Sequence, residues 1–149
     1  MTFDEFNKYL KNMTKEVQDA IRKDLPKIIG NKAVHLFKHN FQTESFFGKK
    51  WREVKRRLKN TKGAAGKRKI LTGPTGNLGR SIRAQPSDAS VTIISDLPYS
   101  DAHNDGTTTA GRGHKTTIPQ RQFIGDDPQL QKEIDKRIRK SLDRIIKRK

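Results

Sequence analysis

The chain has 149 residues, of which 31% are hydrophobic and 33% charged, and its 33 basic residues outnumber 16 acidic ones to give a formal net charge of +17. It has no cysteine, which excludes a disulfide framework, a thiolate nucleophile and a cysteine-ligated zinc site. No apolar run approaches the roughly 18 residues of a membrane-spanning helix and no signal peptide is visible, so we expect a protein without membrane contact that is made in a cytoplasm.

We predict one domain over residues 1–149, with a core so thin that a neighbouring subunit would complete its apolar faces. It begins with a helical arm over residues 1–45. An amphipathic helix is predicted over residues 2–25 and a second helix over residues 27–40, because Pro26 cannot continue the hydrogen-bond ladder of the first. The apolar stripe of the first helix consists of Phe3, Phe6, Leu10, Met13, Val17 and Ile21.

Two pairs of side chains on these helices predict specific contacts. Thr2 and Glu5 have the spacing of a capping box, in which each side chain accepts a hydrogen bond from the backbone N–H of the other. His35 and His39, four residues apart, share one helix face and could bind zinc. However, Leu36 stands where zinc proteases carry their catalytic glutamate, and no third ligand is evident. We interpret both histidines as surface or partner-facing residues and expect no metal.

An aromatic turn follows the arm. Aromatic side chains bury a large area per residue, so we expect them to anchor this turn to the core. The three that are predicted to do so are Phe46, Phe47 and Trp51. Residues 51–58 can form two turns of helix, with Val54 and Leu58 facing inward.

The segment 49–69 is the most basic part of the chain, with eleven Lys or Arg residues and one acid, Glu53. A solvated face explains such a run as well as a lining that faces nucleic acid or an acidic partner. Within it, residues 59–69 have no apolar periodicity, which predicts a mobile basic loop. The candidate DNA-facing or partner-facing residues are Lys49, Lys50, Arg52, Lys55, Arg56, Arg57, Lys59, Lys67, Arg68 and Lys69.

The centre of the chain carries β rather than α signals. Strands are predicted over residues 81–84 and 91–94, the second of them rich in β-branched residues, with a tight reversal over residues 85–88 between them. Residues 98–105 then predict a short turn of helix that stops at Gly106. The fold class is therefore predicted to be α+β: a small antiparallel β-sheet or hairpin centre flanked by N-terminal and C-terminal amphipathic helices.

Glycines in this central segment raise the question of a phosphate-binding loop. Gly73, Gly76 and Gly79 are closely spaced. A Walker pattern with Gly79 as its second glycine needs its first glycine at position 74, which is Pro74. No buried strand precedes the turn either. Turn geometry explains these glycines, and we expect no nucleotide cofactor.

One cluster has the residue types of an active site. Asp101, His103, Asp105 and the later His114 could hold a divalent ion for phosphodiester hydrolysis. Nothing in the sequence fixes a nucleophile, a base and an electrophile together, so we interpret Asp101–Asp105 as a solvated turn and expect no catalysis.

The C-terminal part contains a loop and a helix. Residues 107–117 are polar and predict a mobile loop or hairpin. After this loop, the side chain of Phe123 is expected to fill an apolar site. Asp127 can cap a final helix whose last turn is basic. Its apolar stripe consists of Leu130, Ile134, Ile138, Leu142, Ile145 and Ile146.

Four short segments occur in an order that resembles the phage virion morphogenesis (tail completion) family. They are Leu71–Gly73, Gly76–Ile82, Tyr99–Gly106 and Ile118–Gly125. The resemblance covers roughly residues 50–147, and the predicted helical N-terminus also fits it. The resemblance implies a structural protein that completes the tail or joins the tail to the head, without catalysis. It also implies a ring of identical subunits that contacts tail-tube or head-connector proteins and is found in the tail or neck of the virion.

The hairpin is the expected joint between subunits, because a two-stranded sheet is marginal alone and gains from added strands. The candidate subunit-contact residues are Val91, Ile93 and Phe123. The competing hypothesis is a basic nucleic-acid-binding protein or a metal-dependent nuclease, based on the charge and on the Asp/His cluster. Charge alone does not separate the two, because a ring through which DNA passes can also be basic, with non-specific contacts to the duplex.

Overall fold

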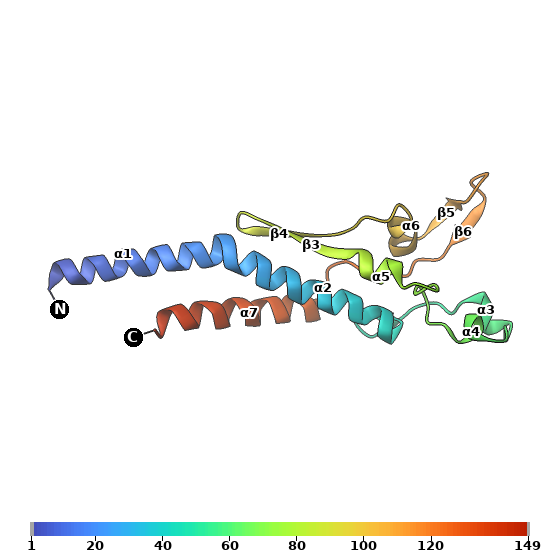
Figure 1. Ribbon diagram of the computed structural model, residues 1–149, viewed down its shortest axis with the longest axis horizontal. Helices are drawn as coiled ribbons and strands as arrows, with labels where there is room; N and C mark the ends of the chain where they lie inside the picture. The colour runs from blue at the N-terminus through green and yellow to red at the C-terminus, as the bar shows by residue number, and fades with distance from the viewer. Residues whose placement is uncertain (1, 149) are drawn as a thin grey trace.

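The computed structural model describes residues 2–148 and has an elongated α+β fold, which confirms the predicted fold class (Figure 1). Helix α2 (Leu25–Thr43) is the central layer. The hairpin of strands β3 (Ile82–Ser87) and β4 (Ser90–Ser95) covers one side of it, and helix α7 (Pro128–Ile146) lies along another side. The start of α1 (Phe3–Asp19) and the end of α7 point toward the same end of the molecule (Figure 1).

The N-terminal arm is one long helical unit with an irregular middle. Helix α1 (Phe3–Asp19) passes into a π-helical segment, η1 (Ala20–Asp24), and then directly into α2. The predicted capping box is present: Thr2 Oγ1 accepts from the N–H of Glu5 at 3.2 Å, and the Glu5 carboxylate accepts from the N–H of Thr2 at 2.6 Å.

The η1 segment is tied to the tip of the β3–β4 hairpin. Pro26 has no N–H, so the carbonyl of Arg22, four residues earlier, lacks its usual helical donor. The N–H of Ala89 at the hairpin tip supplies that hydrogen bond at 3.1 Å. The Arg22 guanidinium also donates two hydrogen bonds, both 2.7 Å long, to the carboxylate of Asp88. The hairpin tip therefore occupies the site that the proline leaves open.

The hairpin is longer than predicted from the sequence, and its reversal lies further along. Its register pairs Ile82 with Ser95 and continues to Ser87 with Ser90, so the turn consists of Asp88 and Ala89. Ala89 has a φ of +53°, which closes a tight two-residue turn. The predicted reversal over residues 85–88 was wrong because Pro86 pairs within the strand, as a proline can at a sheet edge.

The hairpin packs closely against α2 at Gly30. A Cβ atom at this position would lie 2.7 Å from the Cβ of Ala84 and 2.8 Å from the Cγ2 of Val91. Glycine thus allows the strands to approach the helix backbone, and its cost to the helix, about 1 kcal/mol relative to alanine, is offset by this contact.

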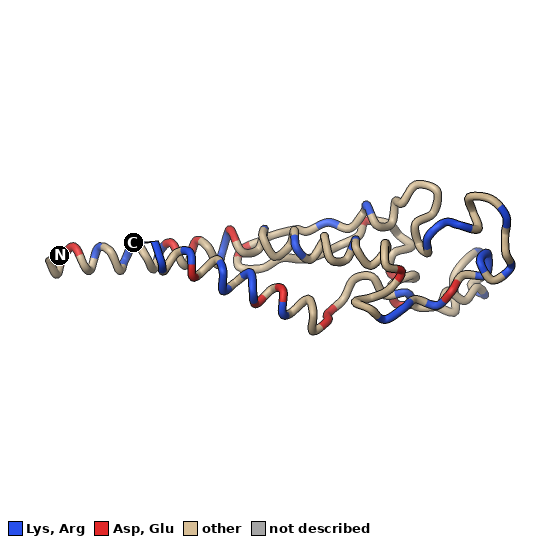
Figure 2. The backbone as a smooth tube through the Cα atoms, turned by 90° about the horizontal axis from the view of Figure 1, so that it is seen from below, with Lys and Arg blue, Asp and Glu red and all other residues tan. Residues whose placement is uncertain are grey.

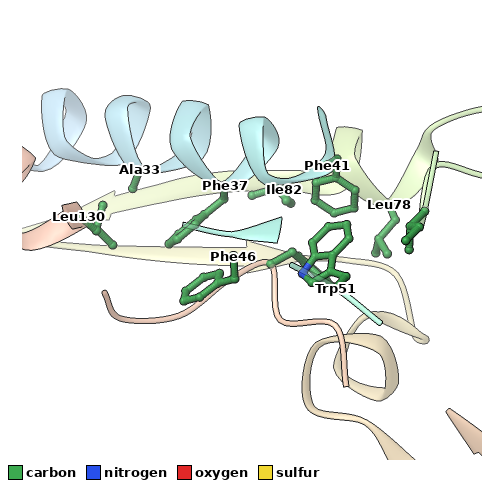
Figure 3. Packing of buried hydrophobic residues seen from close by; sticks show 10 residues of the cluster. Ala33, Phe37, Phe41, Phe46, Trp51, Leu78, Ile82 and Leu130 are labelled. Atoms are coloured by element: carbon green, nitrogen blue, oxygen red, sulfur yellow. The ribbon is translucent and has the colours of Figure 1, made fainter. Parts of the chain in front are cut away.

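The core lies where α2, the aromatic turn and the C-terminal segment meet (Figure 3). The ring of Phe41 lies 5.5 Å from Trp51 and 5.1 Å from Phe123, which is 0% exposed. Phe46 and Trp51 are buried, as predicted for anchoring residues, and the Trp51 indole donates to the carbonyl of Gln122 at 2.7 Å. The aromatic turn and the C-terminal segment are therefore held together by both packing and hydrogen bonds.

The remaining elements are short. They are β1 (Ser45–Phe46), β2 (Lys49–Lys50), α3 (Lys55–Leu58), α4 (Ala64–Lys67), α5 (Asn77–Ser81), α6 (Ser100–Asp105), β5 (Thr107–Ala110) and β6 (Thr116–Ile118). Within residues 2–148 the strands form three separate two-stranded antiparallel sheets.

The structure adds detail to this part of the chain. Residues 107–117 lie in the β5–β6 hairpin, one of the two predicted alternatives, and residues 59–69, predicted as a loop, include the single-turn helix α4. Only the last four residues of 51–58 are helical, and Leu58 points outward with 69% of its surface exposed. Helical periodicity failed there because the segment is extended up to Val54 and leaves too little helix to bury an inner face.

Candidate functional site

The molecule exposes much more surface than its mass requires. Its accessible surface is 10811 Å². A compact monomer of 17.1 kDa is expected to expose about 7,800 Å². The excess of about 3,000 Å² reflects the elongated shape, and so large a surface points to contacts with other molecules.

The largest uncovered apolar feature is the stripe of α1. No residue of α1 is buried, and Phe3, Phe6 and Tyr9 are 78%, 45% and 45% exposed. The start of α1 extends past the end of α7, so nothing in the subunit covers it there (Figure 1). The predicted stripe is therefore present on the helix: Phe3, Phe6 and Leu10 are exposed, whereas Met13 and Val17 are half-buried on the part of the helix arm that packs against α7. We call Phe3, Phe6, Leu10, Met13 and Val17 the α1 stripe.

The three candidate subunit-contact residues contact their own subunit. Val91 is half-buried against Gly30 of α2, and Ile93 is half-buried against the core. Phe123 is fully buried, and its backbone N–H and that of Ile124 both donate to the Asn104 side chain. Phe123 is thus a core residue rather than a surface contact, because the aromatic turn and Asn104 enclose it.

The predicted basic surface is only partly free. Figure 2 shows Lys and Arg gathered at the end of the molecule where α3 and α4 lie. Exposed members of the predicted set are Lys49, Lys50, Arg52, Lys55, Lys59, Lys67 and Lys69. The ammonium groups of two of these lysines donate hydrogen bonds to backbone carbonyls at the C-terminal end of α2. Lys50 donates to Thr43 at 2.9 Å, and Lys69 donates to Gln42 at 2.6 Å.

The half-buried arginines of this set hold the loop together. Arg56 donates to the carbonyls of Ala65, Arg68 and Lys69 at 2.8, 2.7 and 2.9 Å. Arg57 forms a two-pronged ion pair with Glu44, the residue that ends α2. These two guanidinium groups organise residues 55–70 and are not available for DNA.

Glu44 connects three segments. Its carboxylate accepts from Arg57 and from the N–H of Ile70 at 2.7 Å, and its carbonyl accepts from the N–H of Trp51 at 2.9 Å. The hydrogen bonds from Arg57, followed by that from Ile70, hold the pKa of Glu44 below its ordinary value.

We predict that Glu44→Gln lowers the free energy of unfolding by about 2 kcal/mol at pH 7, because it removes the closer and more buried of the two carboxylates that pair with the half-buried Arg57. Glu53→Gln is the matched control, since Glu53 lies 3.5 Å from the same guanidinium but is more exposed, and it should cost less than about 1 kcal/mol. Urea unfolding measures both.

The loss at Glu44 should depend on pH. A carboxyl whose folded pKa is depressed stabilises the protein above its unfolded pKa, about 4.3 for glutamate, and this contribution disappears as the pH falls through the folded value. The stability difference between the wild type and Glu44→Gln should therefore shrink as the pH falls below the unfolded value and through the lower folded one. A difference that is the same at pH 7 and pH 3 would contradict the role of the charge.

The Asp/His cluster is not assembled as a catalytic site. Asp101 and Asp105 are exposed on α6, and His114 lies in the β5–β6 turn. His103 is half-buried beside Tyr99, and burial, followed by the nearby Arg121 charge, lowers its pKa. Among residues 2–148, no group of three or more His, Cys, Asp or Glu side chains is placed to hold a metal, and both His35 and His39 are exposed.

A buried arginine was missed by the sequence analysis. Arg121 is 7% exposed, and its guanidinium donates to the carbonyls of Arg52 at 2.9 Å and Glu53 at 3.4 Å. Burial, followed by the positive charge of Arg52, lowers its pKa. The only sequence signal was its position two residues before Phe123, inside the last of the four family-like segments.

Comparison with known proteins gives one match. The model of the family described as phage virion morphogenesis matches residues 2–143. No curated protein and no solved structure matches the chain. Within the part of the chain that the structure describes, every helix is too short or too polar to cross a membrane.

Proposed function

The chain belongs to the phage virion morphogenesis family, and we propose that it completes the tail or joins the tail to the head as a subunit of a ring, without catalysis. A role in building the phage particle follows from the family. The ring, the position in the tail or neck and the contacts with tail-tube or head-connector proteins are the proposal.

The exposed α1 stripe is the observation that supports a ring. A stable interface buries about 800 Å² per partner, and a subunit in a ring has two interfaces, hence about 1,600 Å². The surface excess of about 3,000 Å² is large enough for both. A head-to-tail contact that closes on itself would bury the stripe of each subunit against the next.

Charge also favours α1 as the contact between copies. Two molecules of a chain with a net charge of +17 repel each other unless neutral surfaces meet. Residues 2–24 are neutral, with five acids and five bases, whereas residues 49–69 carry eleven bases and one acid. The five acids are Asp4, Glu5, Glu16, Asp19 and Asp24, and the five bases are Lys8, Lys11, Lys15, Arg22 and Lys23.

The proposed assembly can be tested by measuring mass in solution. Light scattering across a concentration series should show a defined oligomer, and negative-stain images should show rings. A phage with an amber mutation in the gene should yield unjoined heads and tails that the purified oligomer restores to infectivity. A wild-type protein that stays monomeric at every concentration, with or without tails, would contradict the ring.

Contact with DNA is a further part of the proposal. Exposed lysines at the α3 end would bind phosphates without regard to sequence, and the affinity would fall steeply with salt through counterion release. The logarithm of the DNA association constant falls with the logarithm of the salt concentration. We predict that changing Lys49, Lys55 and Lys59 to Glu makes this negative slope shallower by about 2 to 3. Changing Lys132, Lys136 and Lys140 of α7 to Glu is the control with the same change in charge. Equal effects of the two triple variants, or affinity that ignores salt, would rule out a local contact.

A further inference from the structure

A cleft surrounds the buried Arg121. It consists of two cavities, of about 360 Å³ and about 580 Å³, and Val54 and Arg121 line both. Segment 52–58 and the residues after β6 form the walls of the larger cavity, and the turn after Ile70 forms a wall of the smaller one.

The positive charge in this cleft is only partly neutralised by the subunit. Arg121 takes part in no salt bridge within residues 2–148, and its hydrogen bonds go only to backbone carbonyls. Arg56 lines the smaller cavity, and Arg52 and Lys55 line the larger one together with Glu53, an acid that already pairs with Arg57. A buried guanidinium without an anion is costly, since charges in protein interiors are normally paired. The cleft is therefore complementary to a carboxylate.

The walls are apolar as well as basic. Leu58 and Pro119 line the larger cavity, and Leu71 and Tyr99 line the smaller one. Leu58 is 69% exposed, so its side chain is free to contact an occupant of the larger cavity. An occupant that matches this surface carries apolar side chains next to its negative charges.

We propose that this cleft docks an acidic, apolar segment of another virion protein, with a carboxylate on Arg121 and an apolar side chain on Leu58. The proposal rests on the proposed role of joining a further component to the particle, and it places that contact at the end of the molecule opposite to the start of α1.

DNA fits this cleft less well than a peptide does. Phosphates of a duplex lie on the outside of a wide rod and are contacted by exposed cations, whereas Arg121 is only 7% exposed. A phosphate backbone would also bury no apolar surface of its own against the apolar walls of the cleft. A second copy of the chain is a poorer occupant, because its adjacent acids have contacts within their own chain: Asp126 and Asp127 accept from Gln131 and Gln129, and Glu5, next to Asp4, closes the capping box with Thr2.

The test uses the full-length protein and a fluorescein-labelled peptide in which Glu alternates with Leu and Ile. Fluorescence anisotropy should show saturable binding of this peptide and none of the version with Lys in place of Glu. Leu58→Asp should weaken binding at least tenfold. Thr61→Asp, which adds the same charge at an exposed position outside both cavities, should change it less than twofold.

His103 provides a second measurement. It lines the smaller cavity, and its Nδ1 is buried without a hydrogen-bond partner in the described chain. A carboxylate bound at Arg121 should offset the nearby positive charge and raise the pKa of His103, which an NMR titration with and without the peptide would report. An unchanged His103 titration would overturn the placement of the carboxylate.

Three results would overturn the docking proposal: no binding of the acidic peptide, equal effects of Leu58→Asp and Thr61→Asp, or full displacement of the peptide by a 20-base-pair duplex. A variant with a disrupted α1 stripe separates this proposal from the ring. It should bind the peptide like the wild type even where it fails to assemble, so either proposal can fail alone.

Discussion

Replacing Phe3, Phe6 and Leu10 by Ser is expected to give a folded monomer that no longer assembles or completes tails. These side chains are 78%, 45% and 37% exposed in the subunit, so the fold loses little when they are removed. In a ring they would be buried, and burying an apolar side chain of this size contributes about 1.5 to 3 kcal/mol. Losing three of them should weaken each interface by about 5 kcal/mol, more than a thousandfold.

The control for this variant lies on the same helix. Replacing Lys8, Lys11 and Lys15 by Ser changes as many residues at exposed positions outside the stripe, and it should preserve assembly. Circular dichroism confirms folding of both variants, light scattering gives their mass, and complementation of an amber phage gives their activity. A serine-stripe variant that still forms rings would show that another surface holds the subunits together.

Phe123→Ala is expected to destabilise the subunit by about 3 to 5 kcal/mol, which is a large part of the 5 to 15 kcal/mol available to an ordinary domain. Phe123 is 0% exposed and lies against the ring of Phe41, in a core assembled from segments distant in sequence. Its removal leaves a cavity that the hydrogen-bonded backbone on either side cannot easily close.

Phe3→Ala is the same chemical change at a position that is 78% exposed. It should leave the stability of the monomer within about 0.5 kcal/mol of the wild type. Urea unfolding of both variants at a concentration that keeps them monomeric makes the comparison. Similar losses at the two positions would mean that the core does not centre on Phe123.

The long helices could be predicted because their signals are local. The capping box of Thr2 and Glu5 and the N-cap of Asp127, whose carboxylate accepts from Gln129, depend on neighbours only a few residues away. The final helix begins at Pro128, as its sequence predicts. Strand ends were less predictable, because the position of Pro86 in the hairpin depends on how the tip meets Arg22.

The roles of charged residues depend on distant contacts, and sequence reasoning missed them for that reason. Arg56 and Arg57 belong to a basic run that predicts a solvated or DNA-facing surface, yet they bind carbonyls and Glu44 within the subunit. Arg121 has no local pattern that predicts burial, because the carbonyls it contacts belong to residues about 70 positions earlier. The apolar stripe on α1 could be predicted as a stripe, but which of its side chains stay exposed is a property of the whole fold.

The π-helical segment η1 has a wider turn than the α-helices on either side of it. It therefore sets the angle, about the helix axis, between the apolar stripe of α1 and the apolar face of α2. A residue added to or removed from a helix turns everything beyond it by about 100°. The N–H of Leu25 reaches back to the carbonyl of Ala20, so the face of α2 that meets the hairpin and the stripe of α1 are offset by this wider turn. The direction in which the arm presents its stripe is therefore encoded by spacing rather than by side-chain identity. Deleting one residue from Ala20–Asp24 would keep every side chain of the stripe and aim it elsewhere.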